Sequence, residues 1–197
     1  VGPLGKPTEL DVLKGKNVCV IGGGLGTAIA FPQAKYLHEI GANVDVIMGF
    51  KNKDLVILED ELKESSDNLY ITTDDGSYGR QGFVTQVLEE LLEEGKHYDH
   101  VLTIGPAIMM KNVVTITKPK DIPTTISMNS IMVDGTGMCG CCRLTVGGEM
   151  KFACVDGPDF DGFLVDFDES MNRARNYETA EREHICNLTK EVRNGKV

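Results

Sequence analysis

The chain has 197 residues, of which 41% are hydrophobic, and its formal net charge is −10. That length suits one medium-sized domain, or one domain with a small appendage, and the negative charge argues against nucleic acid as a partner because phosphate binding needs a basic face. No apolar run is long enough to predict a membrane span and no signal-peptide pattern is present, so we expect a cytoplasmic protein.

The first part of the chain alternates between strand and helix patterns. Residues 17–21 form a short apolar run of strand character, and the glycine-rich turn GGGLGTA follows it directly. Residues 28–40 carry apolar side chains at helical spacing and end before Gly41, and residues 43–48 have the composition of a second strand. These segments predict a β-α-β unit whose first turn is rich in glycine.

The alternation then continues. Further strands are predicted over residues 69–73, 100–104 and 124–127, with an amphipathic helix over 83–94. Pro106 suits the first turn of another helix. Strands that alternate with helices predict an α/β fold with a doubly wound parallel sheet.

The pattern changes after Met128. A cysteine-rich loop comes first, and two short strand patterns then flank Gly147-Gly148, which predicts a β-hairpin. The tail from Asp168 is charged and helical in pattern, and the first ten residues, VGPLGKPTEL, have the composition of a linker.

The glycine-rich turn is a candidate phosphate-binding site, because glycines let backbone N–H groups approach a phosphate and a helix N-terminus adds partial positive charge. The match to the GxGxxG fingerprint is imperfect, and no acidic residue ends the second strand. Lys51 and Lys53 follow that strand instead, so NAD(H) and NADP(H) both stay open, and a tight turn without a ligand is the alternative. The candidate residues of this turn are Gly22, Gly23, Gly24, Gly26 and Thr27.

Two further turns fall at the carboxyl ends of predicted parallel strands. Asp74, Asp75 and Gly76 follow one strand, and Gly105-Pro106 follow another. Open α/β sheets bind their ligands along this edge. The three turns together favour a bound dinucleotide over an empty turn.

The cysteine loop has the pattern D-x4-C-x2-C-x11-C, formed by Asp134, Cys139, Cys142 and Cys154. Plant-type [2Fe–2S] loops use C-x4-C-x2-C followed by a distant fourth cysteine, so here a carboxylate replaces the first thiolate. Small residues bring N–H donors close to sulfur, and three glycines lie within the loop. We predict a [2Fe–2S] cluster with these four residues as its ligands.

Other uses of the cysteines stay open. A C-x2-C knuckle is also typical of structural zinc sites, although these usually contain two such pairs. Free thiols or a redox disulfide are a further alternative. We interpret Cys141 as a bystander and Cys19 as a core residue, and we assign Cys186 no role.

These patterns divide the chain into three parts. They are a dinucleotide-binding domain (1–130), a [2Fe–2S] cluster-binding subdomain (131–167) and a C-terminal helical tail (168–197). A nicotinamide gives up two electrons together whereas the cluster accepts one, so a flavin is needed between them. No flavin-binding pattern is present, and the chain begins at Val1 rather than Met, so we expect a preceding segment or a partner to hold the FAD.

Five segments of the chain together resemble the ferredoxin–NADP reductase superfamily. Within it they are most similar to the small (alpha) subunits of NADH-dependent reduced ferredoxin:NADP oxidoreductase, also called sulfide dehydrogenase. The electron-transfer subunits of dihydroorotate dehydrogenase B are close relatives of that branch. The segments are GGGLGTA, LVILEDEL (55–62), TTDDGSYGRQGFVT (72–85), TIGPAIMM (103–110) and MVDGTGMCGCCRLTVGGEMKFACVDGPDFDG (132–162).

The resemblance implies an N-terminal flavin barrel. The segment VGPLGKPTE resembles the last stretch of that barrel. It also implies that the glycine turn and Gly105-Pro106 bind NAD(H), and that electrons pass through FAD and the cluster. The implied partner is a larger subunit with its own flavin and [4Fe–4S] clusters, through which ferredoxin is reached. We assign no general acid or base, because the cofactors carry the chemistry.

Asp134 separates the two branches of this resemblance. The dihydroorotate branch has cysteine at this position, so the carboxylate favours the reduced-ferredoxin:NADP branch, and a carboxylate ligand is expected to tune the cluster's potential and make it pH-sensitive. Two alternatives stay open. One is an electron-transfer subunit of dihydroorotate dehydrogenase B, and the other is a zinc-stapled nucleotide-binding sensor.

Overall fold

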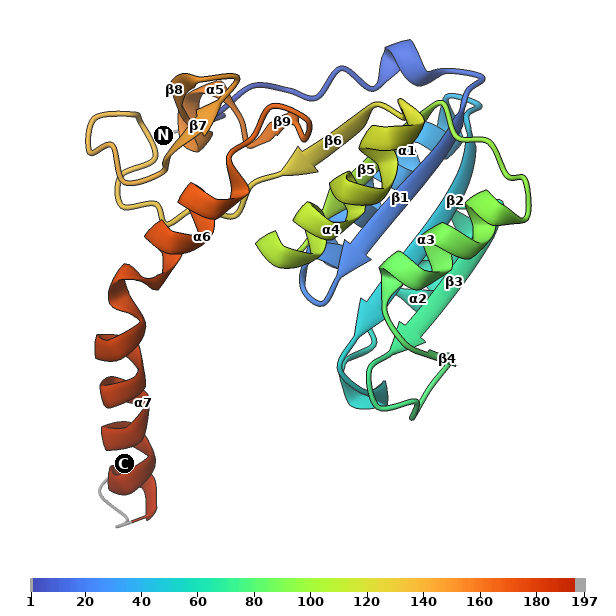
Figure 1. Ribbon diagram of the computed structural model, residues 1–197. Helices are drawn as coiled ribbons and strands as arrows, with labels where there is room; N and C mark the ends of the chain where they lie inside the picture. Colours follow the sequence, from blue (N-terminus) through green and yellow to red (C-terminus); the bar gives the residue numbers. More distant parts are fainter. Residues whose placement is uncertain (1, 194–197) are drawn as a thin grey trace.

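The protein, seen here as a computed structural model that describes residues 2–193, is built around one seven-stranded sheet (Figure 1). The strand order is β4-β3-β2-β1-β5-β6-β9, and every neighbouring pair is parallel except β6 with β9. The predicted doubly wound parallel sheet is confirmed. The strands are β1 (Asn17–Gly23), β2 (Asn43–Phe50), β3 (Asn68–Thr73), β4 (Arg80–Gln81), β5 (His100–Ile104), β6 (Thr124–Ser127) and β9 (Asp159–Asp161).

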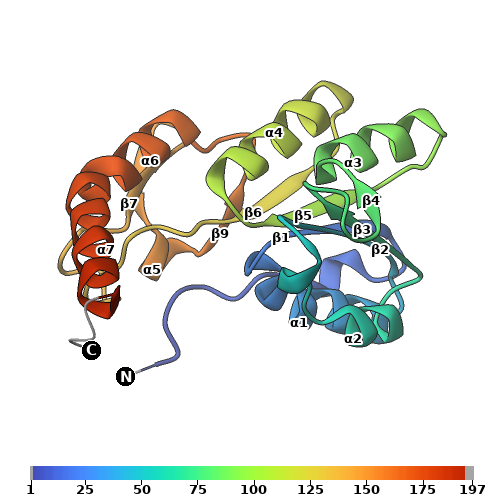
Figure 2. The same ribbon diagram turned by 90° about the horizontal axis from the view of Figure 1, so that it is seen from below.

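Helices cover both faces of the sheet. Helices α1 (Gly26–Glu39) and α2 (Glu59–Glu64) lie on one face, and α3 (Val84–Glu93) and α4 (Ala107–Thr117) lie on the other (Figure 2). The central strands are therefore buried on both sides, and this explains why β1 is a continuous apolar run rather than an alternating one. Short 3-10 turns lie at Asp11–Leu13, Lys53–Leu55, Lys118–Lys120 and Arg175–Tyr177.

A smaller unit follows β6. The predicted hairpin is present as β7 (Arg143–Val146) and β8 (Glu149–Phe152), and α5 (Ala153–Asp156) leads from it into β9. Strand β9 returns to the main sheet beside β6, a connection that the sequence did not predict. The hairpin unit shares a hydrophobic core with α4 and β6, which includes Met110, Ile126 and Leu144.

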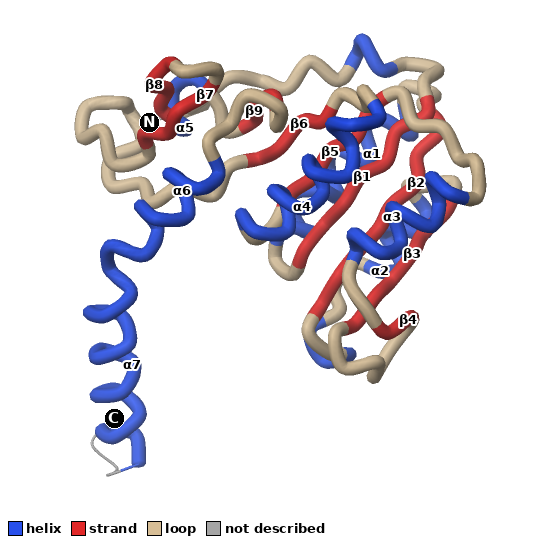
Figure 3. Tube along the Cα trace, in the orientation of Figure 1, coloured by secondary structure: helices blue, strands red, loops and turns tan. Residues whose placement is uncertain are grey.

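The chain ends in two helices, α6 (Phe167–Ala174) and α7 (Glu178–Arg193). Phe167 is buried in the core beneath the hairpin, whereas α7 extends away from the sheet (Figure 3). No helix in the described range is both long and apolar enough to cross a bilayer. Pro106 occupies the N-cap position of α4, one residue before the predicted first turn.

One buried carboxylate lies inside the sheet. Asp45 on β2 is 7% exposed, and it accepts hydrogen bonds from Lys96, from Tyr98 (2.7 Å) and from Asn68 (2.7 Å). Burial alone would raise the pKa of Asp45, but these hydrogen bonds outweigh burial and lower the pKa. The carboxylate is therefore charged and stabilising at neutral pH.

Replacement of Lys96 by Met should lower the free energy of unfolding at pH 7 by about 2 kcal/mol. This is less than for a fully buried pair, because the Lys96 side chain is 35% exposed to solvent. An Asp whose pKa is lower in the folded state than in the unfolded state stabilises the folded protein at pH values above its unfolded pKa of about 4. That stabilisation is lost as the pH falls through the folded pKa. The difference between variant and wild type should therefore shrink below pH ~4, as measured by urea unfolding across pH.

Lys35→Met is the matched control, because Lys35 and Glu39 form an exposed pair at 4.0 Å. Such pairs contribute about 0–1 kcal/mol. Equal losses in the two variants, or a loss for Lys96→Met that does not change with pH, would contradict this account of Asp45.

Candidate dinucleotide cleft and cluster-binding loop

The glycine turn joins β1 to α1 at the carboxyl edge of the sheet. A methyl group at Gly26 would lie 2.2 Å from the carbonyl oxygen of Ile104, so the start of α1 packs directly on the end of β5. A methyl group at Gly22 would lie 2.9 Å from the Cα of Thr27. These two glycines therefore permit close backbone packing, which brings the helix N-terminus to the edge where a phosphate would lie.

The predicted residues of this turn divide into two groups. Gly23 and Gly24 line a cavity of about 780 Å³ at the sheet edge. Thr27 does not, since its side chain is completely buried and its hydroxyl has no hydrogen-bond partner among the described residues. Thr27 thus packs against Gly22 and supports the turn from behind.

The cavity lies where the ends of β1, β2 and β3 meet the N-terminus of α4. Two of its lining residues, Lys51 and Asp74, are charged, and most of the rest are apolar. Leu25 and Phe83, exposed at 84% and 61%, belong to its rim, and sequence reasoning missed both. The lining residues are Gly23, Gly24, Leu25, Gly49, Phe50, Lys51, Leu55, Ile57, Thr72, Asp74, Phe83, Val84, Thr85, Pro106, Ile108, Met109 and Asn112.

Asp75 and Gly76 shape the neighbouring turn instead of lining the cavity. The Asp75 carboxylate accepts hydrogen bonds from the hydroxyl and backbone N–H of Ser77, and these bonds lower its pKa. Gly76 adopts the left-handed region at φ +72°, which suits glycine. Together they hold the segment that carries Asp74.

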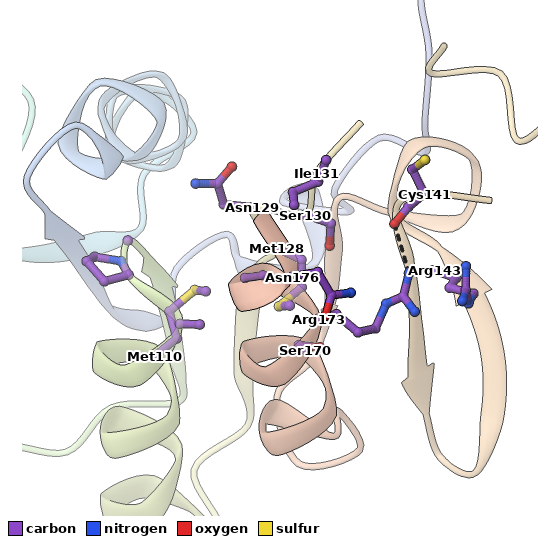
Figure 4. A pocket seen from close by; sticks show the side chains of 14 residues that line it. Met110, Met128, Asn129, Ser130, Ile131, Cys141, Arg143, Ser170, Arg173 and Asn176 are labelled. Atoms are coloured by element: carbon purple, nitrogen blue, oxygen red, sulfur yellow. Dashed lines mark hydrogen bonds between the residues drawn. The ribbon is translucent and has the colours of Figure 1, made fainter. Parts of the chain in front are cut away.

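The second predicted turn, Gly105-Pro106, lies between two cavities. Pro106 lines the 780 Å³ cavity and also a second one of about 400 Å³, which Gly105 lines as well. Figure 4 shows this second cavity between α4, the segment 128–131, Cys141 and α6. The N-terminus of α4 therefore connects the sheet edge with the cysteine loop.

Hydrogen bonds within the cysteine loop fix the carboxylate of Asp134. Asp134 accepts hydrogen bonds from the backbone N–H of Cys139 (2.8 Å) and from both the N–H and the hydroxyl of Thr136. The Cys139 side chain and then Thr136 hold the pKa of Asp134 well below its usual range, so the group is a carboxylate at neutral pH. Gly135, Gly137 and Gly140 all adopt positive φ, which lets the loop curl around this carboxylate.

Two of the predicted sulfur ligands lie together in the core. The sulfur atoms of Cys142 and Cys154 are 3.2 Å apart, and both residues are buried as free thiols. Burial, followed by the hydrogen bond with Cys142, raises the pKa of the Cys154 thiol. Cys139 is exposed, and the N–H of Cys141 points at its sulfur at 3.5 Å.

The loop thus gathers its candidate ligands as two pairs, Asp134 with Cys139 and Cys142 with Cys154. Within residues 2–193 no three His, Cys, Asp or Glu side chains lie close enough together to hold one metal ion. A [2Fe–2S] cluster takes two protein ligands on each iron, since the bridging sulfides supply the others. Three thiols and one carboxylate in two pairs therefore suit a binuclear iron–sulfur cluster better than a single zinc ion, which needs all four donors around one centre.

The parallel sheet, the candidate dinucleotide cleft and the cysteine loop define a ferredoxin reductase-like protein with a candidate cluster-binding segment. The family model of the iron–sulfur cluster binding domain of dihydroorotate dehydrogenase B matches residues 129–166. A solved structure of an NADH-dependent reduced ferredoxin-NADP oxidoreductase superimposes with a TM-score of 0.84 and 44% identity, over 96% of this chain and 67% of that one. The chain belongs to this ferredoxin reductase-like family, so the predicted resemblance and the iron–sulfur segment are confirmed.

Two curated relatives are also similar along most of the chain. An uncharacterized protein from the adh 3′ region of Clostridium beijerinckii is 56% identical over 187 residues, covering 92% of this chain. A homolog of the dihydroorotate dehydrogenase B (NAD+) electron transfer subunit from Thermotoga maritima is 47% identical over 182 residues, again covering 92%. The chain spans 63% of the length of each of these relatives.

Replacement of Gly26 by Ala should lower the free energy of unfolding by about 3 kcal/mol, because its methyl group would force α1 away from β5. Gly41→Ala is the control, since Gly41 has positive φ (+88°) but no neighbour within 4 Å. We expect that control to cost about 1 kcal/mol. Urea unfolding of both variants checks this, and equal losses would mean that the α1–β5 contact is not a tight constraint.

Proposed function

We propose that this chain is the nucleotide- and cluster-binding part of an electron-transfer subunit that connects NAD(P)H, FAD and a [2Fe–2S] cluster. The observation that carries the proposal is the shared position of Pro106, which lines both the dinucleotide cleft and the cavity beside Cys141. Two redox sites joined by one helix terminus suit a relay better than two unrelated binding sites. The electrons would pass toward ferredoxin and NADP on a larger partner subunit.

The proposed cluster ligands are Asp134 and Cys139 on one iron and Cys142 and Cys154 on the other. The Cys139 side chain beside the Asp134 carboxylate and the contact between the Cys142 and Cys154 sulfurs support this assignment. When bound, the cluster would supply one-electron transfer, and the residues of the chain hold and shield it. Cys141 faces Cys139 through its backbone N–H and stays outside the ligand set.

The proposed dinucleotide site is the 780 Å³ cleft. The pyrophosphate would lie beside Gly23 and Gly24 at the start of α1, where the partial positive charge of the helix N-terminus favours an anion. Asp74 and Lys51 lie where a ribose would be recognised, the first suited to a free 2′-hydroxyl and the second to a 2′-phosphate. We propose NADH as the better ligand, because the Asp74 carboxylate repels a phosphate.

FAD and the partner subunit belong to the longer protein. The curated relatives extend beyond the matched region by more than a third of their length, which leaves room for a flavin-binding barrel. The similar solved structure concerns flavin-based electron bifurcation. We propose that the longer form of this chain holds FAD and joins a larger flavin and [4Fe–4S] subunit.

Electron transfer to or from dihydroorotate dehydrogenase is the second candidate. The match of residues 129–166 to the cluster-binding domain of that system favours it. Asp134 at the first ligand position favours the ferredoxin–NADP branch instead. Activity of the full subunit with each kind of partner separates the two.

The first test is the metal content of the anaerobically purified protein. We expect about two irons and two sulfides per chain, with visible absorption that bleaches on reduction. Cys154→Ser should abolish this absorption, since it removes a buried ligand. Cys186→Ser, an exposed cysteine far along α7, should leave it unchanged. A colourless protein that contains zinc would refute the proposed cluster.

The second test is nucleotide affinity, measured by titration calorimetry. Asp74→Ala should weaken NADH binding about tenfold through the lost hydrogen bonds to the ribose. Asp54→Ala makes the same charge change on an exposed residue outside the cleft lining, so its affinity should equal that of wild type. Unchanged NADH affinity in Asp74→Ala would remove this residue from the site.

A further inference from the structure

Two arginine side chains bind backbone carbonyl oxygens of the C-x2-C turn, residues 139–142. The guanidinium of Arg143 donates to the carbonyl oxygen of Gly140 at 3.1 Å. The guanidinium of Arg173 donates to the carbonyl oxygen of Cys141 at 3.2 Å, a contact that Figure 4 marks with a dashed line. Arg143 begins β7 and Arg173 lies in the last turn of α6. Side chains from β7 and α6 therefore bind two consecutive peptide units of one short turn.

Together with the turn's own backbone bond, from the Arg143 N–H to the Gly140 carbonyl at 3.4 Å, these contacts fix which way the backbone N–H groups of the turn point. A trans peptide is planar, so its carbonyl and its N–H face opposite directions. The peptide between Gly140 and Cys141 directs its oxygen to Arg143 and its N–H to the sulfur of Cys139, at 3.5 Å. In the next peptide the oxygen of Cys141 is bound by Arg173, so planarity turns the N–H of Cys142 away from that arginine.

The charge of the arginines is not neutralised nearby. Among the residues that the structure describes, neither Arg143 nor Arg173 forms a salt bridge with a carboxylate. Arg173 is half-buried against the 400 Å³ cavity, where solvent screens its charge less than at an open surface. Two positive charges thus lie on the carbonyl side of these two peptides, the first of which directs its N–H to the sulfur of Cys139.

We propose that Arg173 is a positioning residue that, together with Arg143, turns the peptide N–H groups of this turn toward the cluster sulfurs and raises the cluster's reduction potential. The inference rests on the proposed function, since it needs a cluster in this loop. A protein sets the reduction potential of an iron–sulfur cluster in part through the net charge around it and the hydrogen bonds to its sulfur atoms. Because Arg173 belongs to α6, the packing of the C-terminal helices then takes part in setting it.

The test compares Arg173→Gln, Arg173→Lys and Arg175→Gln in the full-length subunit that carries its cluster. Redox titration followed by electron paramagnetic resonance of the reduced cluster gives the midpoint potential directly. Arg173→Gln should shift the one-electron reduction equilibrium about tenfold toward the oxidised form, which corresponds to about 59 mV. Arg173→Lys, which keeps the charge without the planar fork, should lie between that variant and wild type.

Arg175→Gln removes the same charge two residues further on, from an exposed side chain with no hydrogen bond among the described residues. Its potential should equal that of wild type. A wild-type potential in Arg173→Gln, or the same shift in Arg175→Gln, would overturn the inference. If Arg173→Gln fails to hold a cluster, a wild-type midpoint potential in Arg173→Lys would overturn the inference instead. A wild-type protein that holds no cluster would instead refute the proposed function.

Discussion

The contact between the start of α1 and the end of β5 is the constraint on which the rest of this molecule depends. Only a residue without a side chain fits at Gly26, whose added methyl group would lie 2.2 Å from the Ile104 oxygen. Strand β1 pairs with β2 on one side and β5 on the other, so this contact lies where the strand order reverses. Crevices at such positions bind ligands in open α/β sheets, and the cleft opens there.

Helix α4 extends that constraint to the second half of the chain. Its N-terminus lines the candidate dinucleotide cleft through Pro106, while Met110 lies in the core that also contains Cys142 and Cys154. The distance between the two candidate sites is thus set by one short helix rather than by a linker. A rigid spacing of this kind suits electron transfer, which depends on the positions of the redox groups.

The sequence predicted the elements whose apolar pattern is strong and local. The strands at 100–104 and 124–127 are found with the predicted bounds, and the hairpin around Gly147-Gly148 is found as well. It did not predict β4 or β9, because two- and three-residue strands are defined by their neighbours and not by their own composition. The Asp45 network was missed for a related reason, since Lys96 lies some fifty residues further along the chain.

The candidate site shows the same division between local and distant signals. The spacing of Asp134 and the cysteines is a local pattern, and the structure brings these residues together in pairs. The cation that binds the Cys141 carbonyl is Arg173 of α6, 32 residues further along the chain, and no spacing rule indicates it. The role of Thr27 also needed coordinates, because burial alone separates a supporting residue from a lining one.

The burial of Cys142 and Cys154 within a shared hydrophobic core has a thermodynamic consequence for the whole second unit. These thiols are side chains of the same apolar cluster that anchors the hairpin, α6 and the end of the sheet. An inorganic group held by them binds the native state and not the unfolded chain, so its occupancy adds to the stability of that cluster by mass action. A metal group bound at these thiols would therefore also protect this unit against proteolysis.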